Sequence, residues 1–121
     1  MTLTDKGILD KYNDGQRYFK DIDLNNGDLS ETNLQGISFD NCFLAVDFRG
    51  ANLRGAKFTN SNIKTCNFRG ADLTDAHFEN LLVDSADFEG AKADRATFKD
   101  GYYHSATLQQ ADFDEWTKRK K

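Results

Sequence analysis

The sequence predicts an all-β fold, a quadrilateral β-helix, from three observations. A five-residue pattern repeats 19 times in succession from Ile22 to Glu115, with a small residue in the first place and mostly Leu or Phe in the third. A period of five fits neither an α-helix nor an ordinary strand, and short fixed periods are typical of solenoids. The last two places of many units hold Gly, Asn, Asp, Ser or Thr, which favour turns. Four such turns close a coil of about 20 residues, so the repeats predict nearly five coils stacked at about 4.8 Å.

Within each unit the first and third residues are expected to point inward and the second outward, because alternate residues of extended chain share an orientation. One four-residue unit, CFLA at 42–45, shifts the register by one residue. Allowing for it, every fourth unit lies on the same face. The third-place residues on the first face are Leu29, Phe48, Phe68, Phe88 and Leu108, and on the second Leu34, Leu53, Leu73, Ala93 and Phe113. Those on the third are Phe39, Phe58, Phe78 and Phe98, and on the fourth Leu24, Leu44, Ile63, Val83 and Tyr103. Phenylalanine ladders should therefore line two opposite walls of the interior.

Units such as ANLRG (51–55) and ADLTD (71–75) resemble the A(D/N)LxX motif of the pentapeptide-repeat family. Fifteen of the 19 third places are Leu or Phe, and nine of the 19 first places are Ala, so the resemblance is specific. It covers about four fifths of the chain. The resemblance implies that the β-helix is right-handed. The opening ILDKYNDGQRYFKDIDL also resembles that of small cyanobacterial members of the family.

The two ends of the chain do not repeat. Residues 1–21 are expected to cap the first coil with one short helix, which starts at the N-cap Thr4 and ends near Asn13. The repeats then occupy 22–115, and 116–121 form a C-terminal cap in which Trp116 covers the last coil, followed by a basic tail. In some family members the carboxyl end is instead a dimer contact, which here would use Phe113 and Trp116. Capping, and with it a monomer, is the preferred interpretation.

Composition limits the partners. The 121 residues fit one domain. The formal charge is −4, and because the last four residues contribute +4, the remainder carries −8, which argues against direct nucleic-acid binding. No apolar run approaches the roughly 20 residues of a membrane span, and the first residues lack a signal-peptide core. Two cysteines without a framework pattern indicate a reducing compartment, so a cytoplasmic location is expected.

The sequence does not predict an enzyme. His77 and His104 fall at outward places on different faces, without a second ligand to complete a metal site. Cys42 and Cys66 open their units and should be small buried groups. The many carboxylates lie at solvated places rather than in a dry cleft. No catalytic residue, cofactor-binding residue or metal ligand is therefore assigned.

The fourth face departs from the pattern. None of its units opens with Ala, and it contains the shortened unit. Its second-place residues are Asp23, Phe43, Asn62, Leu82 and Tyr102, whereas this place is polar on the other faces. Phe43, Leu82 and Tyr102, with His104 at the rim, would form an exposed apolar patch, which predicts a protein–protein interaction module. In the competing interpretation Phe43 folds over the register shift and the other two side chains are isolated.

The alternative function is nucleic-acid mimicry. Some family members resemble duplex DNA in width and acidity and occupy type II topoisomerases. Asp28, Asp47 and Asp87 form one acidic row here, but basic residues such as Arg49 and Arg69 interrupt the acidic rows. The rod is also short and has no large loop insertion, so mimicry is the less favoured hypothesis.

Overall fold

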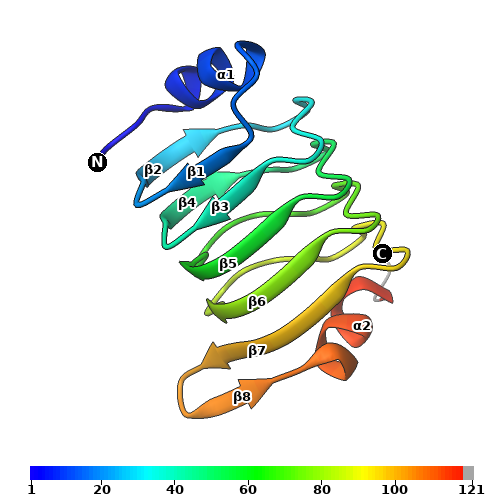
Figure 1. The fold of residues 1–121 in the computed structure, drawn as a ribbon. Helices are drawn as coiled ribbons and strands as arrows, with labels where there is room; N and C mark the ends of the chain where they lie inside the picture. The colour runs from blue at the N-terminus through cyan, green and yellow to red at the C-terminus, as the bar shows by residue number, and fades with distance from the viewer. Residues whose placement is uncertain (119–121) are drawn as a thin grey trace.

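The computed structural model describes residues 1–118 and shows a stack of short strands between two helices (Figure 1). In chain order the elements are α1 (Asp5–Asn13), β1 (Tyr18–Lys20), β2 (Asp23–Asp28), β3 (Ser38–Asp40), β4 (Phe43–Asp47), β5 (Lys57–Asn62), β6 (His77–Leu82), β7 (Thr97–Tyr103), β8 (Ala106–Leu108) and α2 (Gln110–Lys118). One sheet contains all eight strands, and the pairings among β1 to β7 are all parallel. The predicted β-solenoid is therefore confirmed.

Four rows of parallel pairings define four faces. Isolated bridges join Asp47, Asn67 and Asp87 on the first face, and Asn33, Asn52, Asp72 and Lys92 on the second. The third face consists of β1, β3 and the first halves of β5, β6 and β7. The fourth consists of β2, β4 and the second halves of the same three strands. The cross-section is thus quadrilateral, as the period of five predicts.

The shortened unit lacks one corner residue. Phe58 pairs with Phe78, 20 residues away, whereas Phe39 pairs with Phe58, only 19 away. In the first coil Asn26, with φ of 55°, lies unpaired where the register against β4 shifts. In the second coil β4 runs through the equivalent corner without a left-handed residue. The four-residue unit therefore removes a corner and leaves the inward side chains in register.

Most corners contain one residue with a left-handed backbone, which explains the turn-forming residues at the ends of the units. Gly50, Gly70 and Gly90 have φ of 66° to 75° at one corner, and Asn60 and Asn80 have φ of 53° and 58° at another. Glycine has no Cβ to clash in this region, and Asn tolerates it better than most residues do.

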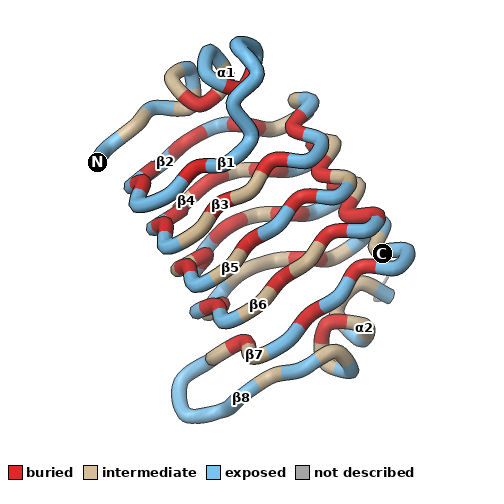
Figure 2. The backbone as a smooth tube through the Cα atoms, in the orientation of Figure 1, coloured by how far each residue is buried: buried red, intermediate tan, exposed pale blue. Residues whose placement is uncertain are grey.

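Aromatic ladders fill the interior. Burial alternates along every coil, so red segments line the inside of the tube (Figure 2). On the first face the rings of Phe68 and Phe88 stack 4.8 Å apart, and on the third those of Phe58 and Phe78 stack 5.1 Å apart. Across the lumen Phe68 meets Phe78 edge-on at 5.8 Å. Stacked and edge-to-face contacts are the geometries that aromatic quadrupoles favour, so the two predicted ladders form one continuous core.

Helix α1 covers the first coil, as expected. The Thr4 hydroxyl accepts a hydrogen bond from the Gly7 amide at the helix start, and Ile8 and Tyr12 are buried beneath the helix. The Tyr12 hydroxyl donates to the Gln35 carbonyl at 2.6 Å, which ties the helix to the second face. The solenoid starts earlier than the repeats indicate, however, because β1 pairs with β3 and Phe19 joins the third-face ladder, 5.8 Å from Phe39.

The carboxyl end differs from the repeat pattern. After β7 the chain reverses at His104, whose φ is 55°, and β8 pairs with β7 antiparallel. Leu108 therefore does not continue the first face, and Phe113 lies on α2 rather than on a fifth coil. The solenoid has about four turns instead of nearly five. In earlier coils the left-handed residue comes two places after the inward side chain, and here it comes one place after Tyr103, so the corner becomes a hairpin.

Helix α2 closes the lumen with two aromatic side chains. Phe113 is fully buried and stacks on Phe98 at 5.2 Å, and Trp116 stacks on Phe88 at 5.7 Å. The predicted covering role of Trp116 is therefore confirmed, as part of a nine-residue helix. Beyond Lys118 the basic tail lies outside the described residues. No helix within residues 1–118 is long and apolar enough to cross a membrane.

Candidate protein-binding face

The second-place residues of the fourth face form one row along the solenoid. Strand pairing aligns Asp23 with Phe43, Phe43 with Asn62, Asn62 with Leu82, and Leu82 with Tyr102. Phe43 is 47% exposed and Leu82 is 41% exposed, while Tyr102 is half-buried. All three border a shallow cavity of about 370 Å³. The structure therefore brings three of the four predicted site residues to one surface.

Asparagines form one rim of this cavity. Asn41, Asn60 and Asn80 stand at the corner between the third and fourth faces, each with a left-handed backbone. The Asn80 side-chain amide donates to the Asn60 side-chain oxygen at 2.8 Å. These residues were not among the predicted site residues. The signal that could have found them is their shared last place in successive third-face units.

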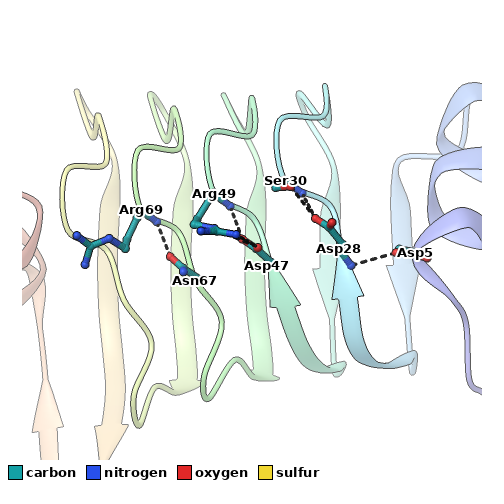
Figure 3. Close-up of polar contacts among 7 residues, drawn as sticks. All are labelled: Asp5, Asp28, Ser30, Asp47, Arg49, Asn67 and Arg69. Atoms are coloured by element: carbon teal, nitrogen blue, oxygen red, sulfur yellow. Dashed lines mark hydrogen bonds and ion pairs between the residues drawn. The ribbon is translucent and has the colours of Figure 1, made fainter.

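On the first and second faces, second-place Asp and Asn residues hold the turns. The Asp28 carboxylate accepts from the Ser30 amide, Asp47 accepts from the Arg49 amide, and the Asn67 side chain accepts from the Arg69 amide, each at 3.0 Å (Figure 3). Such contacts replace a backbone turn with a side-chain acceptor. On the fourth face Asn62 makes the same contact with the Lys64 amide. Phe43, Leu82 and Tyr102 have no such acceptor, so these side chains do not stabilise a turn in this way.

His104 lies apart from the apolar row. It is exposed at the hairpin after β7, its Nδ1 is 3.6 Å from an Asp84 carboxylate oxygen, and its ring centroid is 4.3 Å from that of Tyr103. It does not line the cavity that Phe43, Leu82 and Tyr102 border. Tyr103, which the repeat register places inward, is 44% exposed because it precedes the hairpin rather than a corner.

The groups that could carry chemistry are engaged elsewhere or buried. His77 lies on the third face between Thr97 and Glu79, at 2.5 Å and 2.9 Å. Burial raises the pKa of the Cys66 thiol to about 12, and burial also raises the pKa of Cys42. Within residues 1–118, no three or more His, Cys, Asp or Glu side chains are placed to hold a metal ion.

Arginines neutralise the acidic rows of the first and second faces. Arg49 pairs with Asp47 at 2.7 Å, and Arg54 with Asp72 at 3.0 Å. The hydrogen bonds from Arg49 hold the pKa of the Asp47 carboxyl below its usual range. These pairs are partly exposed and contribute little to stability, but they break the continuity of negative charge along the rows.

The arginine at the next coil bridges two carboxylates. Arg69 lies 3.0 Å from Asp87 and 2.9 Å from Glu89, as the one-coil spacing of Arg69 and Glu89 predicts. Two carboxylates thus share one guanidinium, which leaves a net negative charge at this end of the first face.

Comparison with known proteins supports the assignment of the fold. A family model described as pentapeptide repeats, in eight copies, matches residues 42–80 and 62–100. Comparison with curated protein sequences finds no match. Two trypsin-treated variants of QnrB1, described as a plasmid-mediated fluoroquinolone resistance protein, are similar in structure. One has a TM-score of 0.50 and 17% identity over 69% of this chain and 61% of its own length. The other has a TM-score of 0.43 and 19% identity over 65% of this chain and 44% of its own length.

The chain thus spans less than two thirds of both QnrB1 chains, and at these identities the likeness concerns the fold alone. The family match is independent of that likeness, because it rests on the repeats themselves. It covers the same units whose third-place side chains form the aromatic core. The chain belongs to the pentapeptide-repeat family.

Proposed function

We propose that this protein is a non-enzymatic module that binds a partner protein through its fourth face. The observation that carries the proposal is the exposure of Phe43 and Leu82 in a row where the other faces place polar residues. Burying a large apolar side chain against a partner is favourable by about 1.5–3 kcal/mol. Since neither side chain holds a turn or fills the core, a contact outside the chain is the role that accounts for both.

The scaffold suits binding. Parallel pairing fixes Leu82 beside Tyr102 and Phe43 beside Asn62, so the row is ordered before a partner arrives. Preorganised surfaces lose little entropy on association. Aromatic residues at the centre of an interface commonly dominate its energy, and Phe43 and Tyr102 would be the anchors. Helices over both ends of the solenoid support a monomeric module, and two buried free thiols support a reducing, cytoplasmic location.

The proposal is tested by affinity capture from the source organism with three forms of the protein. The face variant carries Phe43→Asp, Leu82→Asp and Tyr102→Asp. The control carries Asn33→Asp, Asn52→Asp and Asn67→Asp, which adds the same three charges on other faces and retains the acceptors that hold the turns. We expect wild type and control to retain a partner that the face variant loses, with at least tenfold weaker binding to the purified partner.

Circular dichroism first establishes that both variants are folded. Equal capture by all three forms would refute the fourth face as the binding surface. Loss of capture by the control as well as by the face variant would show that added negative charge, rather than the apolar row, weakens binding.

A second candidate function is mimicry of nucleic acid toward a type II topoisomerase. The −8 charge outside the last four residues supports it, as does the fold likeness to a fluoroquinolone resistance protein. The arginine pairs of Asp47, Asp72 and Asp87 weigh against it, because they interrupt the negative rows. A supercoiling assay with purified gyrase distinguishes the candidates. Inhibition or protection by wild type and face variant alike would favour mimicry, and no effect at a large molar excess would remove it.

A further inference from the structure

The last coil leaves part of its backbone edge unpaired. In the preceding coil the Phe68 amide donates to the Asp87 carbonyl at 2.7 Å, the Gly70 amide donates to Glu89, and the Cys66 carbonyl accepts from the Asp87 amide. One coil later the equivalent groups are the Phe88 and Gly90 amides and the Ala86 carbonyl. Among residues 1–118, none of these three groups has a hydrogen-bond partner. An open edge of this kind is a template for another strand.

The chain closes its other edges at this end by specific means. On the third face the Gln110 side-chain oxygen accepts from the Phe98 amide at 2.7 Å, and that of Gln109 accepts from the Asp100 amide at 2.9 Å. On the fourth face β8 pairs with β7. The second-face edge at Ala93 is also open, but of the two open edges only the first-face edge borders cavities.

Two cavities flank the open first-face edge. One of about 160 Å³ lies along residues 86–89 beside Trp116. The other, of about 300 Å³, is mainly apolar and lies between Val83, Leu108 and the same tryptophan. Ala86 and Trp116 line both, so the two cavities are neighbours at the place where a fifth coil would start.

We propose that this edge binds an extended peptide segment of a partner protein by parallel strand addition. In the register of the coils before it, one peptide residue donates its amide to the Ala86 carbonyl and accepts from the Phe88 amide. The residue two places later accepts from the Gly90 amide. Main-chain hydrogen bonds of this kind supply affinity, and side-chain pockets supply specificity.

The register also determines which side chains fit. The two paired peptide residues point outward beside Asp87 and Glu89, which share only Arg69, so basic side chains are favoured there. The residue before them points inward, toward the cavity lined by Val83, and should be apolar. The residue between them must be small, because Trp116 already occupies the next place on the first-face ladder. The site therefore selects the pattern apolar–basic–small–basic.

This site is separate from the fourth face and does not depend on the function proposed for that face. It can be tested with the capped peptide Thr-Leu-Lys-Ser-Lys-Thr, because Trp116 is the single tryptophan and lies at the site. We expect a saturable change in tryptophan fluorescence and slower hydrogen exchange at the Phe88 and Gly90 amides.

Three control peptides test the register. N-methylation of the first lysine removes the amide that faces Ala86, replacement of both lysines by glutamate reverses the charge, and exchange of leucine and serine keeps the composition but misplaces the apolar side chain. Each should weaken binding on the order of tenfold or more. Equal binding of the exchanged peptide would overturn the proposal in favour of general charge attraction, and equal binding of the N-methylated peptide would overturn strand addition.

Protein variants complete the test. Glu89→Lys should weaken binding of the peptide on the order of tenfold, whereas Glu79→Lys, the same charge change on the third face, should not change it. Phe43→Asp should also leave peptide binding unchanged, which separates this site from the fourth face. If neither fluorescence nor hydrogen exchange responds up to the solubility limit of the peptide, the edge is occupied by water and the proposal fails.

Discussion

At the scale of the residue, the motif follows from hydrogen bonding as much as from packing. The second place of a first- or second-face unit holds Asp or Asn because its side-chain oxygen accepts the amide two residues later, as at Asp28, Asp47 and Asn67 (Figure 3). The acidic rows of these faces therefore have a structural cause. A ligand is not needed to explain them, whereas the apolar residues of the fourth face lack such a cause.

The turn function predicts how Asp47 responds to substitution. Asp47→Asn keeps the oxygen that accepts from the Arg49 amide and loses only an exposed ion pair, so the free energy of unfolding should change by less than about 0.5 kcal/mol. Asp47→Ala removes the acceptor and should lower it by about 1 kcal/mol. Urea unfolding of both variants measures the difference. Equal destabilisation would mean that the charge, not the turn, matters.

Burial predicts the reactivity of the thiols. A thiolate, not a thiol, reacts with iodoacetamide, and burial raises the pKa of Cys66 to about 12. Cys42 is only 4% exposed and its thiol donates to the Phe19 carbonyl. We expect no alkylation of either cysteine at pH 8 in the folded protein and alkylation of both in denaturant, measured by mass spectrometry. Rapid labelling of folded protein would contradict the burial described here.

At the scale of the element, the two helices solve the same problem at opposite ends. A solenoid coil is stable only between neighbours, so its terminal coils need caps. Helix α1 uses Ile8 and Tyr12, and α2 uses Phe113 and Trp116, whose spacing of three residues places both rings on one helical face. Each helix thus supplies the apolar surface that a further coil would have supplied.

The cap predicts a large effect at Phe113. Because this ring is fully buried between Phe88 and Phe98, Phe113→Ala should lower the free energy of unfolding by about 3–5 kcal/mol. Phe43→Ala is the matched control, since that ring is half exposed and its loss should cost about 0.5 kcal/mol or less. Chemical denaturation measures both. Similar values for the two variants would show that α2 does not cap the core.

At the scale of the whole molecule, the charges are arranged in local pairs on a solvated surface. Hydrogen bonds from Ser30 lower the pKa of Asp28, and the hydrogen bond from Arg95 lowers that of Asp75. Asp40 is lowered in the same way by Asn60 and Tyr18. The depressed values occur along the length of the rod, so protonation at low pH should affect the molecule as a unit.

Stability should therefore fall on acidification. A carboxyl whose pKa is lower in the folded state contributes its full stabilisation above its unfolded value of about 3.9 and loses it as the pH falls through the folded value. We expect the thermal midpoint to be nearly constant from about pH 7 to 5 and to decrease below about pH 4. Circular dichroism melts across this range measure it, and a midpoint that rises on acidification would contradict the prediction.

The sequence predicted the repeat architecture well because each coil uses the same local rule. The third-place residues Phe48, Phe58, Phe68 and Phe78 stack as predicted, and the four-residue unit shifts the register where expected. The row of Phe43, Leu82 and Tyr102 was also predictable, since it needs only the face assignment. His104 was misplaced because its position depends on a hairpin that the period does not encode.

By itself, the sequence determined the fold class, the inward ladders and the presence of a cap at each end, because all three follow from local periodicity and its interruption. Only the tertiary structure decided where the solenoid stops. The units ATLQQ and ADFDE satisfy the five-residue pattern, yet they form β8 and part of α2. A coil at the end of the chain would leave its own lumen open, whereas a helix carrying Phe113 and Trp116 closes it. The free energy of covering the last rings therefore outweighs the local pattern.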